Sequence, residues 1–152
     1  MKKIMALLLV IGVVFLAACG SSAKTADLNA VRESIAAQYD LSEMMALSED
    51  DLLDMYGVKA DDVKQYVALI AKSSTSADEI LLFEAKDADA AARIREKLEA
   101  RYQSKLNEAK DYLPDEYTKI SGCKVETSGN FISLIVSSEA EAMTKIYQAA
   151  FK

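Results

Sequence analysis

The apolar residues that follow residue 27 first recur at helical spacing. Leu28, Val31 and Ile35 lie three and four positions apart, which predicts an amphipathic helix. Thr25 or Asp27 is available as its N-cap. Apolar residues continue at a less regular helical spacing as far as residue 45, so we expect a first helix with a frayed or broken end.

Two more helices are expected before residue 71. Ser48 and Asp51 have the spacing of a capping box, and Gly57 lies where a left-handed C-cap would end a short helix. A further helix is predicted behind Asp61 and Asp62, whose negative charges suit a helix N-terminus. Its apolar residues lie at positions i, i+3, i+4 and i+7, namely Val63, Tyr66, Val67 and Ile70. Residues 27–71 are therefore predicted to be a helical part, and residues 72–77 a loop.

Residues 78–152 have the pattern of a βαββα unit. The helix of this unit has the strongest helical signal of the chain, and its N-cap would be Asp87. The expected elements, in order, are a strand at 80–83, a helix from 88 to Pro114, strands at 123–127 and 131–136 around a turn at 128–130, and a helix behind a capping box at 138–141.

Such a unit is half of a ferredoxin-like fold, a split βαβ arrangement, so the predicted class is α+β. Its three strands would form an antiparallel sheet in the order first, third, second. The handedness of the connections between strands would place both helices of the unit on one face of the sheet. The other face would be left for the helices of residues 27–71 or for a partner.

The first eighteen residues have the composition of a bacterial export signal. Lys2 and Lys3 precede an apolar run, and Leu16-Ala17-Ala18-Cys19 places small residues directly before a cysteine. An uncleaved membrane anchor is the alternative, but a bilayer-spanning helix needs about 20 apolar residues, more than this run offers. We therefore predict a lipoprotein signal at 1–18, a tether at 19–26 and a single domain at 27–152.

The tetrapeptide that ends at Cys19 resembles a lipobox, in which the cysteine receives a diacylglycerol and becomes the first residue of the mature chain. Two acyl chains provide stable membrane attachment, whereas a single chain binds reversibly. The predicted location is therefore the outer, extracytoplasmic face of the cell membrane. Cys123 would then be the remaining thiol, and its place in a strand-like run predicts a buried core residue.

Composition excludes several classes of function. The chain has no histidine, which rules out a Ser-His-Asp triad and a histidine-ligated metal. Its net charge of −6 opposes binding to nucleic acid. Asp87 and Asp89 lack the further oxygen ligands of a calcium loop, and acids near helix starts are better explained as caps than as paired catalytic carboxylates. We expect no metal, no cofactor and no catalytic residues, with a small histidine-free hydrolase as a remote alternative.

Four residues form a candidate binding surface. Tyr112, Pro114 and Tyr117 place two aromatic rings on a rigid connection, which suits the rim of a sugar- or peptide-binding site. A hydrophobic latch that closes the long helix onto the sheet is the alternative for these rings. Lys86 lies at a strand end, where ligands often gather, although a solvated lysine beside a helix cap explains it as well.

The order and spacing of several segments resemble those of bacterial lipoproteins that contain the domain of unknown function 4358. The segments that carry the resemblance are the lipobox at Cys19, Asp78-Glu79-Ile80, Phe83-Glu84-Ala85-Lys86-Asp87, Tyr112-Leu113-Pro114-Asp115-Glu116-Tyr117 and Gly129-Asn130-Phe131. This resemblance implies no particular activity.

The sequence therefore predicts a membrane-tethered module that binds or scaffolds and does not catalyse a reaction. Its expected partners are the membrane, through the diacylglycerol on Cys19, and a protein or glycan of the cell envelope. The alternative is an accessory subunit of an envelope-modifying enzyme or a transporter.

Overall fold

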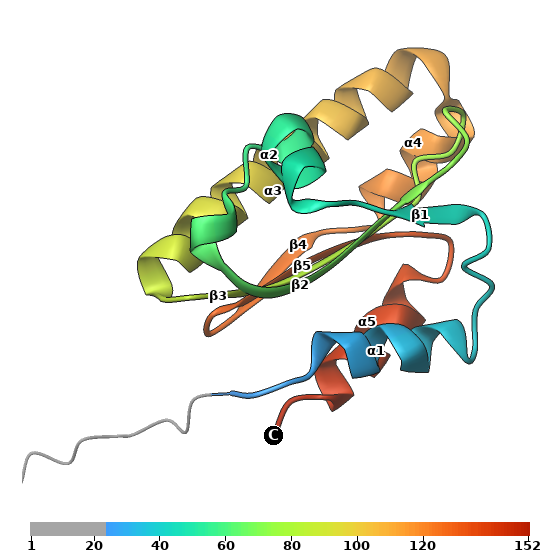
Figure 1. Ribbon diagram of the computed structural model, residues 1–152. Coiled ribbons are helices and arrows are strands. Elements are labelled where there is room, and N and C mark those ends of the chain that lie inside the picture. The colour runs from blue at the N-terminus through green and yellow to red at the C-terminus, as the bar shows by residue number, and fades with distance from the viewer. Residues whose placement is uncertain (1–23) are drawn as a thin grey trace, which may run out of the picture.

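The computed structural model describes residues 24–152, which form a five-stranded sheet covered on both faces by helices (Figure 1). The predicted signal at 1–18 and the lipidation site Cys19 lie outside the described residues. The elements in chain order are α1 (Leu28–Ala36), β1 (Met44–Ala46), α2 (Glu49–Tyr56), the 3-10 turn η1 (Ala60–Asp62), β2 (Val63–Ala71), β3 (Glu79–Ala85), α3 (Ala88–Tyr112), α4 (Pro114–Ser121), β4 (Val125–Ser128), β5 (Phe131–Val136) and α5 (Ala140–Ala149).

The sheet has the strand order β1-β2-β3-β5-β4, and each neighbouring pair is antiparallel. Helices α2, α3 and α4 lie on one face, and α1 and α5 lie on the other (Figure 1). Central strand β3 is buried along its whole length. Its side chains point alternately into two hydrophobic cores. Leu81 and Phe83 pack beneath α3, whereas Ile80 and Leu82 pack against the layer of α1 and α5.

Three predicted helix caps are confirmed. The Asp27 carboxylate accepts hydrogen bonds from the backbone N–H groups at the start of α1, and the Asp87 carboxylate accepts one from Ala90 at the start of α3. Ser48 and Asp51 form the predicted capping box of α2. That helix ends at Gly57, whose φ of 67° is left-handed and therefore favours glycine.

The predicted helix at residues 63–70 is wrong, because this segment is strand β2. Positions i, i+3, i+4 and i+7 are apolar here because the strand is covered on both faces and has apolar residues on both sides. The loose extension of the first helix to residue 45 is wrong as well. Helix α1 ends at Ala36, and residues 44–46 form the edge strand β1. The segment predicted to be helical, 27–71, thus supplies two of the five strands.

The α+β class is confirmed, but the predicted three-stranded sheet is only part of the sheet. The predicted order of the three C-terminal strands holds, since β3, β5 and β4 are neighbours in that order. The placement of both helices on one face is wrong, because α3 packs on one face and α5 on the other. Strands β3 and β4 are parallel to each other, so handedness constrains the crossover helix α3. Within residues 24–152 α5 does not connect two strands, so that constraint does not apply to it.

The region after residue 112 contains a helix that the sequence did not predict. Pro114 is the first residue of α4. Proline has no backbone N–H group, and this is tolerated here because the N–H groups of a first helical turn have no hydrogen-bond partner within the helix. The hairpin of β4 and β5 is confirmed, with Gly129 at a φ of 61° in its turn, although its first strand begins at Val125 rather than at residue 123. The predicted capping box of α5 is absent, since the N-cap of α5 is Glu139, which makes no side-chain capping bond.

Cys123 is buried, as the sequence predicted, and its thiol donates a hydrogen bond to the carbonyl oxygen of Lys119 at 3.2 Å. Burial raises the pKa of this thiol above its ordinary value, which keeps it protonated and unreactive. In residues 24–152, none of the helices combines the length and the apolar character needed to cross a bilayer.

Candidate functional site

A pocket of about 330 Å³ opens between the loop that joins β2 to β3, the second half of α3, and α4. Loop residues Ser73, Ser74, Ser76 and Ala77 line it, together with Tyr112, Leu113 and Glu116 from the end of α3 and the start of α4. The charged residues Glu79, Arg101 and Lys105 also line the pocket. The pocket therefore combines apolar, hydroxyl and charged groups within a volume that suits a small polar ligand.

The centre of the site is Glu79, a carboxylate that is only 1% exposed. Glu79 is the first residue of β3, and its side chain lies on the face that α3 covers. Its Oε1 atom accepts a hydrogen bond from the Tyr56 hydroxyl at 2.9 Å and from Nη2 of Arg101 at 2.8 Å. The Lys105 Nζ atom lies 3.2 Å from the same oxygen. A buried carboxylate thus has a phenol and two cations around one of its two oxygens.

The other oxygen of this carboxylate lacks such hydrogen-bond partners. Oε2 of Glu79 is buried and has no hydrogen-bond partner among residues 24–152. Buried polar atoms are nearly always paired, because leaving one unpaired costs about 1–3 kcal/mol. The first oxygen accepts every donor of the cluster, so Oε2 stays a buried acceptor with no protein donor beside it in the described residues.

The cations of this cluster have pKa values that their surroundings shift in opposite directions. Burial lowers the pKa of the Lys105 ammonium, and the Glu79 carboxylate only partly opposes that effect. Burial would also lower the pKa of the Arg101 guanidinium, but the Glu79 charge and hydrogen bonds raise it overall. Burial and the negative charge of Glu79 raise the pKa of the Tyr56 hydroxyl, which therefore stays protonated and acts as a donor.

Lys105 also binds the wall of the pocket. Its Nζ atom donates to the carbonyl oxygen of Ala77 at 2.7 Å, and the Glu116 carboxylate accepts the N–H of the same residue at 2.7 Å. Lys119 bridges Glu116 to Asp78. Burial would raise the pKa of Glu116, but its bonds to Lys119 and Ala77 lower it overall. These bonds join α3 and α4 to the loop before β3 and give the pocket fixed walls.

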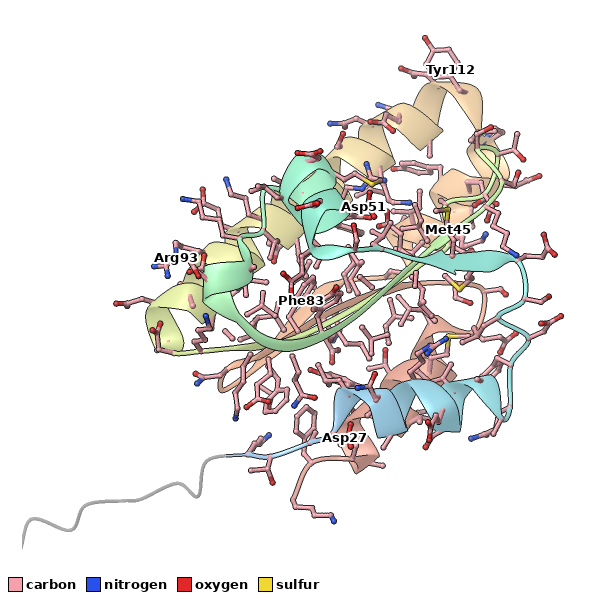
Figure 2. All side chains as sticks on the ribbon, in the orientation of Figure 1. Asp27, Met45, Asp51, Phe83, Arg93 and Tyr112 are labelled. Carbon is pink, nitrogen blue, oxygen red and sulfur yellow. The ribbon has the colours of Figure 1, made fainter. Side chains whose placement is uncertain are left out.

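The structure separates the four residues of the predicted binding surface. Tyr112 is 82% exposed and lines the pocket at the end of α3, so the alternative of a hydrophobic latch is wrong for this ring (Figure 2). Tyr117 is 38% exposed, and neither it nor Pro114 lines the pocket. Lys86 is exposed just before the start of α3, about 37 Å of helix away from Tyr112. Lys86 therefore does not belong to this site.

The sequence contained a signal for the buried cluster that the prediction did not use. Arg101 and Lys105 are four residues apart and lie on the same stripe of α3 as Leu98 and Ala109, which are buried. Charged residues on the buried stripe of a helix need a buried partner of opposite charge. Glu79 at the start of a buried strand is that partner, but its pairing with α3 depends on the tertiary fold.

The arrangement is suited to binding. Its groups offer cationic donors, loop hydroxyls and an exposed aromatic ring. Within residues 24–152, histidine, cysteine and acidic side chains form no group of three or more that could hold a metal ion.

Comparison with known proteins gives one match. A family model described as Domain of unknown function (DUF4358) matches residues 37–137. The chain matches none of the curated proteins and none of the solved structures. The matched region contains the whole sheet, helices α2 to α4 and every residue that lines the pocket, whereas α1 and α5 lie outside it.

Proposed function

Because the chain belongs to the family of the domain of unknown function 4358 (DUF4358), we propose a function for the site that lies inside the family region. The protein is a lipoprotein, anchored through a diacylglycerol on Cys19 to the outer face of the cell membrane. It acts there as a non-enzymatic binding module, and its pocket receives a ligand of the cell envelope. Nucleic acid is not among its partners, because the chain carries a net charge of −6.

The pocket of about 330 Å³, with the charged residues Glu79, Arg101 and Lys105 in its lining, is the observation that supports binding most directly. The exposed ring of Tyr112 borders the same pocket. The chain has no histidine, the side chain used most often in general acid–base catalysis.

The position of the pocket agrees with a tether at the N-terminus. The described chain begins at Lys24, close to the last residue, whose backbone N–H donates to the carbonyl oxygen of Thr25. The turn from α3 to α4 lies at the opposite end of the molecule, as the positions of Asp27 and Tyr112 show (Figure 2). A lipid on Cys19 would therefore leave the pocket facing away from the membrane.

The accessory-subunit alternative would need an exposed apolar surface for a stable protein partner. Leu53 and Met55 are exposed on α2, but they are two positions apart and point in different directions around the helix. Met45, the other half-exposed methionine, lies on the edge strand β1. These side chains lie on different sides of α2 and on β1, so we favour the pocket as the site of recognition.

Replacing Cys19 by alanine tests the anchor. We expect wild-type protein in the membrane fraction of the expressing cells, labelled by a fatty-acid probe and accessible to added protease on intact cells. The Cys19→Ala variant should lose the label and the membrane association, because the acyl chains provide the attachment. Cys123→Ala is the matched control and should keep both. An unlabelled wild-type protein, or a Cys19→Ala variant that stays in the membrane with its label, would refute the proposed anchor.

A further inference from the structure

Strand β2 is longer than the edge strand that covers it. The register pairs β1 only with residues 69–71 at the end of β2 (Figure 1). One further bond joins the two segments, from the N–H group of Leu47 to the carbonyl oxygen of Ala68. The chain then turns at Ser48 into α2. Residues 63–67 of β2 therefore have β3 on one side and, within the described chain, no strand on the other.

Tyr66 has backbone groups that point out of the sheet at this open edge. In an antiparallel pair only every second residue bonds to a given neighbour. Ala68 bonds to Leu47 on the β1 side, and the register with β3 is regular from Gln65 to Ile70. The N–H and C=O groups of Tyr66, two residues from Ala68, therefore face the same side. In residues 24–152 neither β1 nor a loop backbone pairs with them.

A hollow of about 220 Å³ lies at this open edge, and we call it the edge pocket. Its lining comes from the edge of β2 and from the helices on both faces of the sheet, namely residues 63–66 of β2, Asn29 of α1, Glu49 and Leu52 of α2, and Val58 and Ala60 before β2. Asn29, Glu49, Ala60 and Lys64 are exposed, so a ligand can enter the edge pocket from solvent. A further strand beside β2 would occupy this position between the two helix layers.

The side of the edge pocket beneath α2 is apolar. Val63 and Tyr66 are partly exposed there, and both pack against the core that contains Leu52 and Val58. Residues that lie directly opposite each other in two paired strands have their side chains on the same face of the sheet. A strand residue opposite Tyr66 would therefore direct its side chain to the face that α2 covers, where an apolar side chain fits.

Acidic residues border the edge pocket at the start of α2. Glu49 lines the pocket and is exposed. Burial raises the pKa of the Tyr66 hydroxyl, and the negative charges of Glu49 and Asp51 raise it further, so both carboxylates lie near this side chain. Lys64, the cation of the lining, is already paired with Glu84 at 2.6 Å. The local charge therefore favours a basic ligand over an acidic one.

From these features we infer that the open edge of β2 binds an extended, basic peptide segment of a partner protein, which adds a strand beside Tyr66 and places an apolar side chain beneath α2. In strand addition of this kind, main-chain hydrogen bonds supply affinity and side-chain pockets supply specificity. The linings of the edge pocket and of the pocket at the turn from α3 to α4 share no residue. The inference therefore goes beyond the function proposed above and does not depend on it.

The test selects peptides from a phage library of random heptapeptides with the detergent-solubilised, full-length protein. We expect the selected peptides to share basic residues beside an apolar one, and synthetic copies of them to bind saturably in calorimetry. Only alternate amides of an added strand bond to the edge, so N-methylation of one alternate set should weaken binding by about tenfold or more, and methylation of the other set by less than about threefold.

A pair of charge reversals on α2 locates the peptide. Glu49→Lys should weaken binding of a selected basic peptide about tenfold, because it reverses the charge that borders the edge pocket. Asp54→Lys is the matched control, since it makes the same change of charge on the same helix at a residue that does not line the edge pocket. Both residues are exposed, so neither substitution disturbs packing. The Asp54→Lys variant should keep its affinity within about twofold, as should Tyr112→Ala in the other pocket.

Other outcomes would overturn the inference. Selection of no peptide, or of acidic peptides, would contradict a basic partner segment at this edge. Equal effects of the two methylation sets would mean that the peptide does not pair as a strand. Loss of binding in Tyr112→Ala but not in Glu49→Lys would place the peptide in the other pocket. A full-length protein that sediments as a dimer, and that Glu49→Lys converts to a monomer, would show that a second copy of the chain covers the edge.

Discussion

Replacement of Glu79 by leucine is expected to lower the free energy of unfolding by about 3 kcal/mol, because it leaves two buried cations and a buried phenol without their acceptor. Leucine is close to glutamate in size, so the effect comes from charge and hydrogen bonding. Oε1 of Glu79 is the common partner of Tyr56, Arg101 and Lys105. Urea denaturation followed by circular dichroism measures the change as a lower midpoint at an unchanged slope.

The matched control is the same substitution at Glu108, on the exposed side of the same pocket. Glu108 accepts one hydrogen bond, from Ser104 one turn away on α3, and it is exposed. The Glu108→Leu variant should therefore stay within about 0.5 kcal/mol of the wild type. Similar losses in both variants would mean that the buried cluster contributes nothing particular to stability.

Replacement of the whole cluster by apolar residues is expected to restore stability and abolish binding. The variant combines Glu79→Leu with Tyr56→Phe, Arg101→Met and Lys105→Met, which removes every charge and the phenol together. Buried ion pairs exchanged for well-packed apolar residues are often neutral or more stable by about 1–4 kcal/mol, because the desolvation cost of the charges disappears. The pocket would lose the charged groups of its lining.

Denaturation and calorimetry on this fourfold variant separate a structural role from a binding role. We expect a midpoint close to that of the wild type, well above that of Glu79→Leu, together with loss of ligand binding in the pocket. A fourfold variant that remained as unstable as Glu79→Leu would show that the cluster holds the fold together. Retained ligand affinity would show that the charged cluster takes no part in recognition.

Local signals in the sequence predicted those elements whose structure depends on nearby residues. Asp27, Ser48 and Asp87 cap helices as expected, because an N-cap needs only the next few backbone N–H groups. The hairpin turn at Gly129 likewise follows from its own residues. Membership of the family could also be predicted from the sequence. Segments between residues 78 and 131 carried the resemblance, and the family model matches residues 37–137.

Features that depend on tertiary burial were not predictable in the same way. Strand β2 has Val67, Ala68 and Leu69 buried in succession, and a strand covered on both faces has no alternation to distinguish it from a helix. The cover comes from α1 on one face and from the layer of α2 and α3 on the other, elements that precede and follow β2 in the chain. The number of strands and the faces occupied by the helices therefore required the structure.

The candidate site was predictable in part. The sequence placed Tyr112 in a candidate binding surface, with a buried hydrophobic latch as the alternative, and the structure exposes this ring beside a cavity. Lys86 was wrongly grouped with it, since position along the chain does not show that α3 separates the two residues. Glu79, Arg101 and Lys105 were missed because a carboxylate and its cations come together only when β3 packs against α3.

Photo-crosslinking in intact cells tests most directly whether the pocket is the site of binding. Benzoylphenylalanine introduced at position 112 lies at the rim of the pocket, and the same residue at position 86 lies exposed near the other end of α3. The account predicts that position 112 forms crosslinks to an envelope component, that the fourfold cluster variant loses them, and that position 86 forms none. Equal crosslinking from both positions, or from position 86 alone, would contradict it.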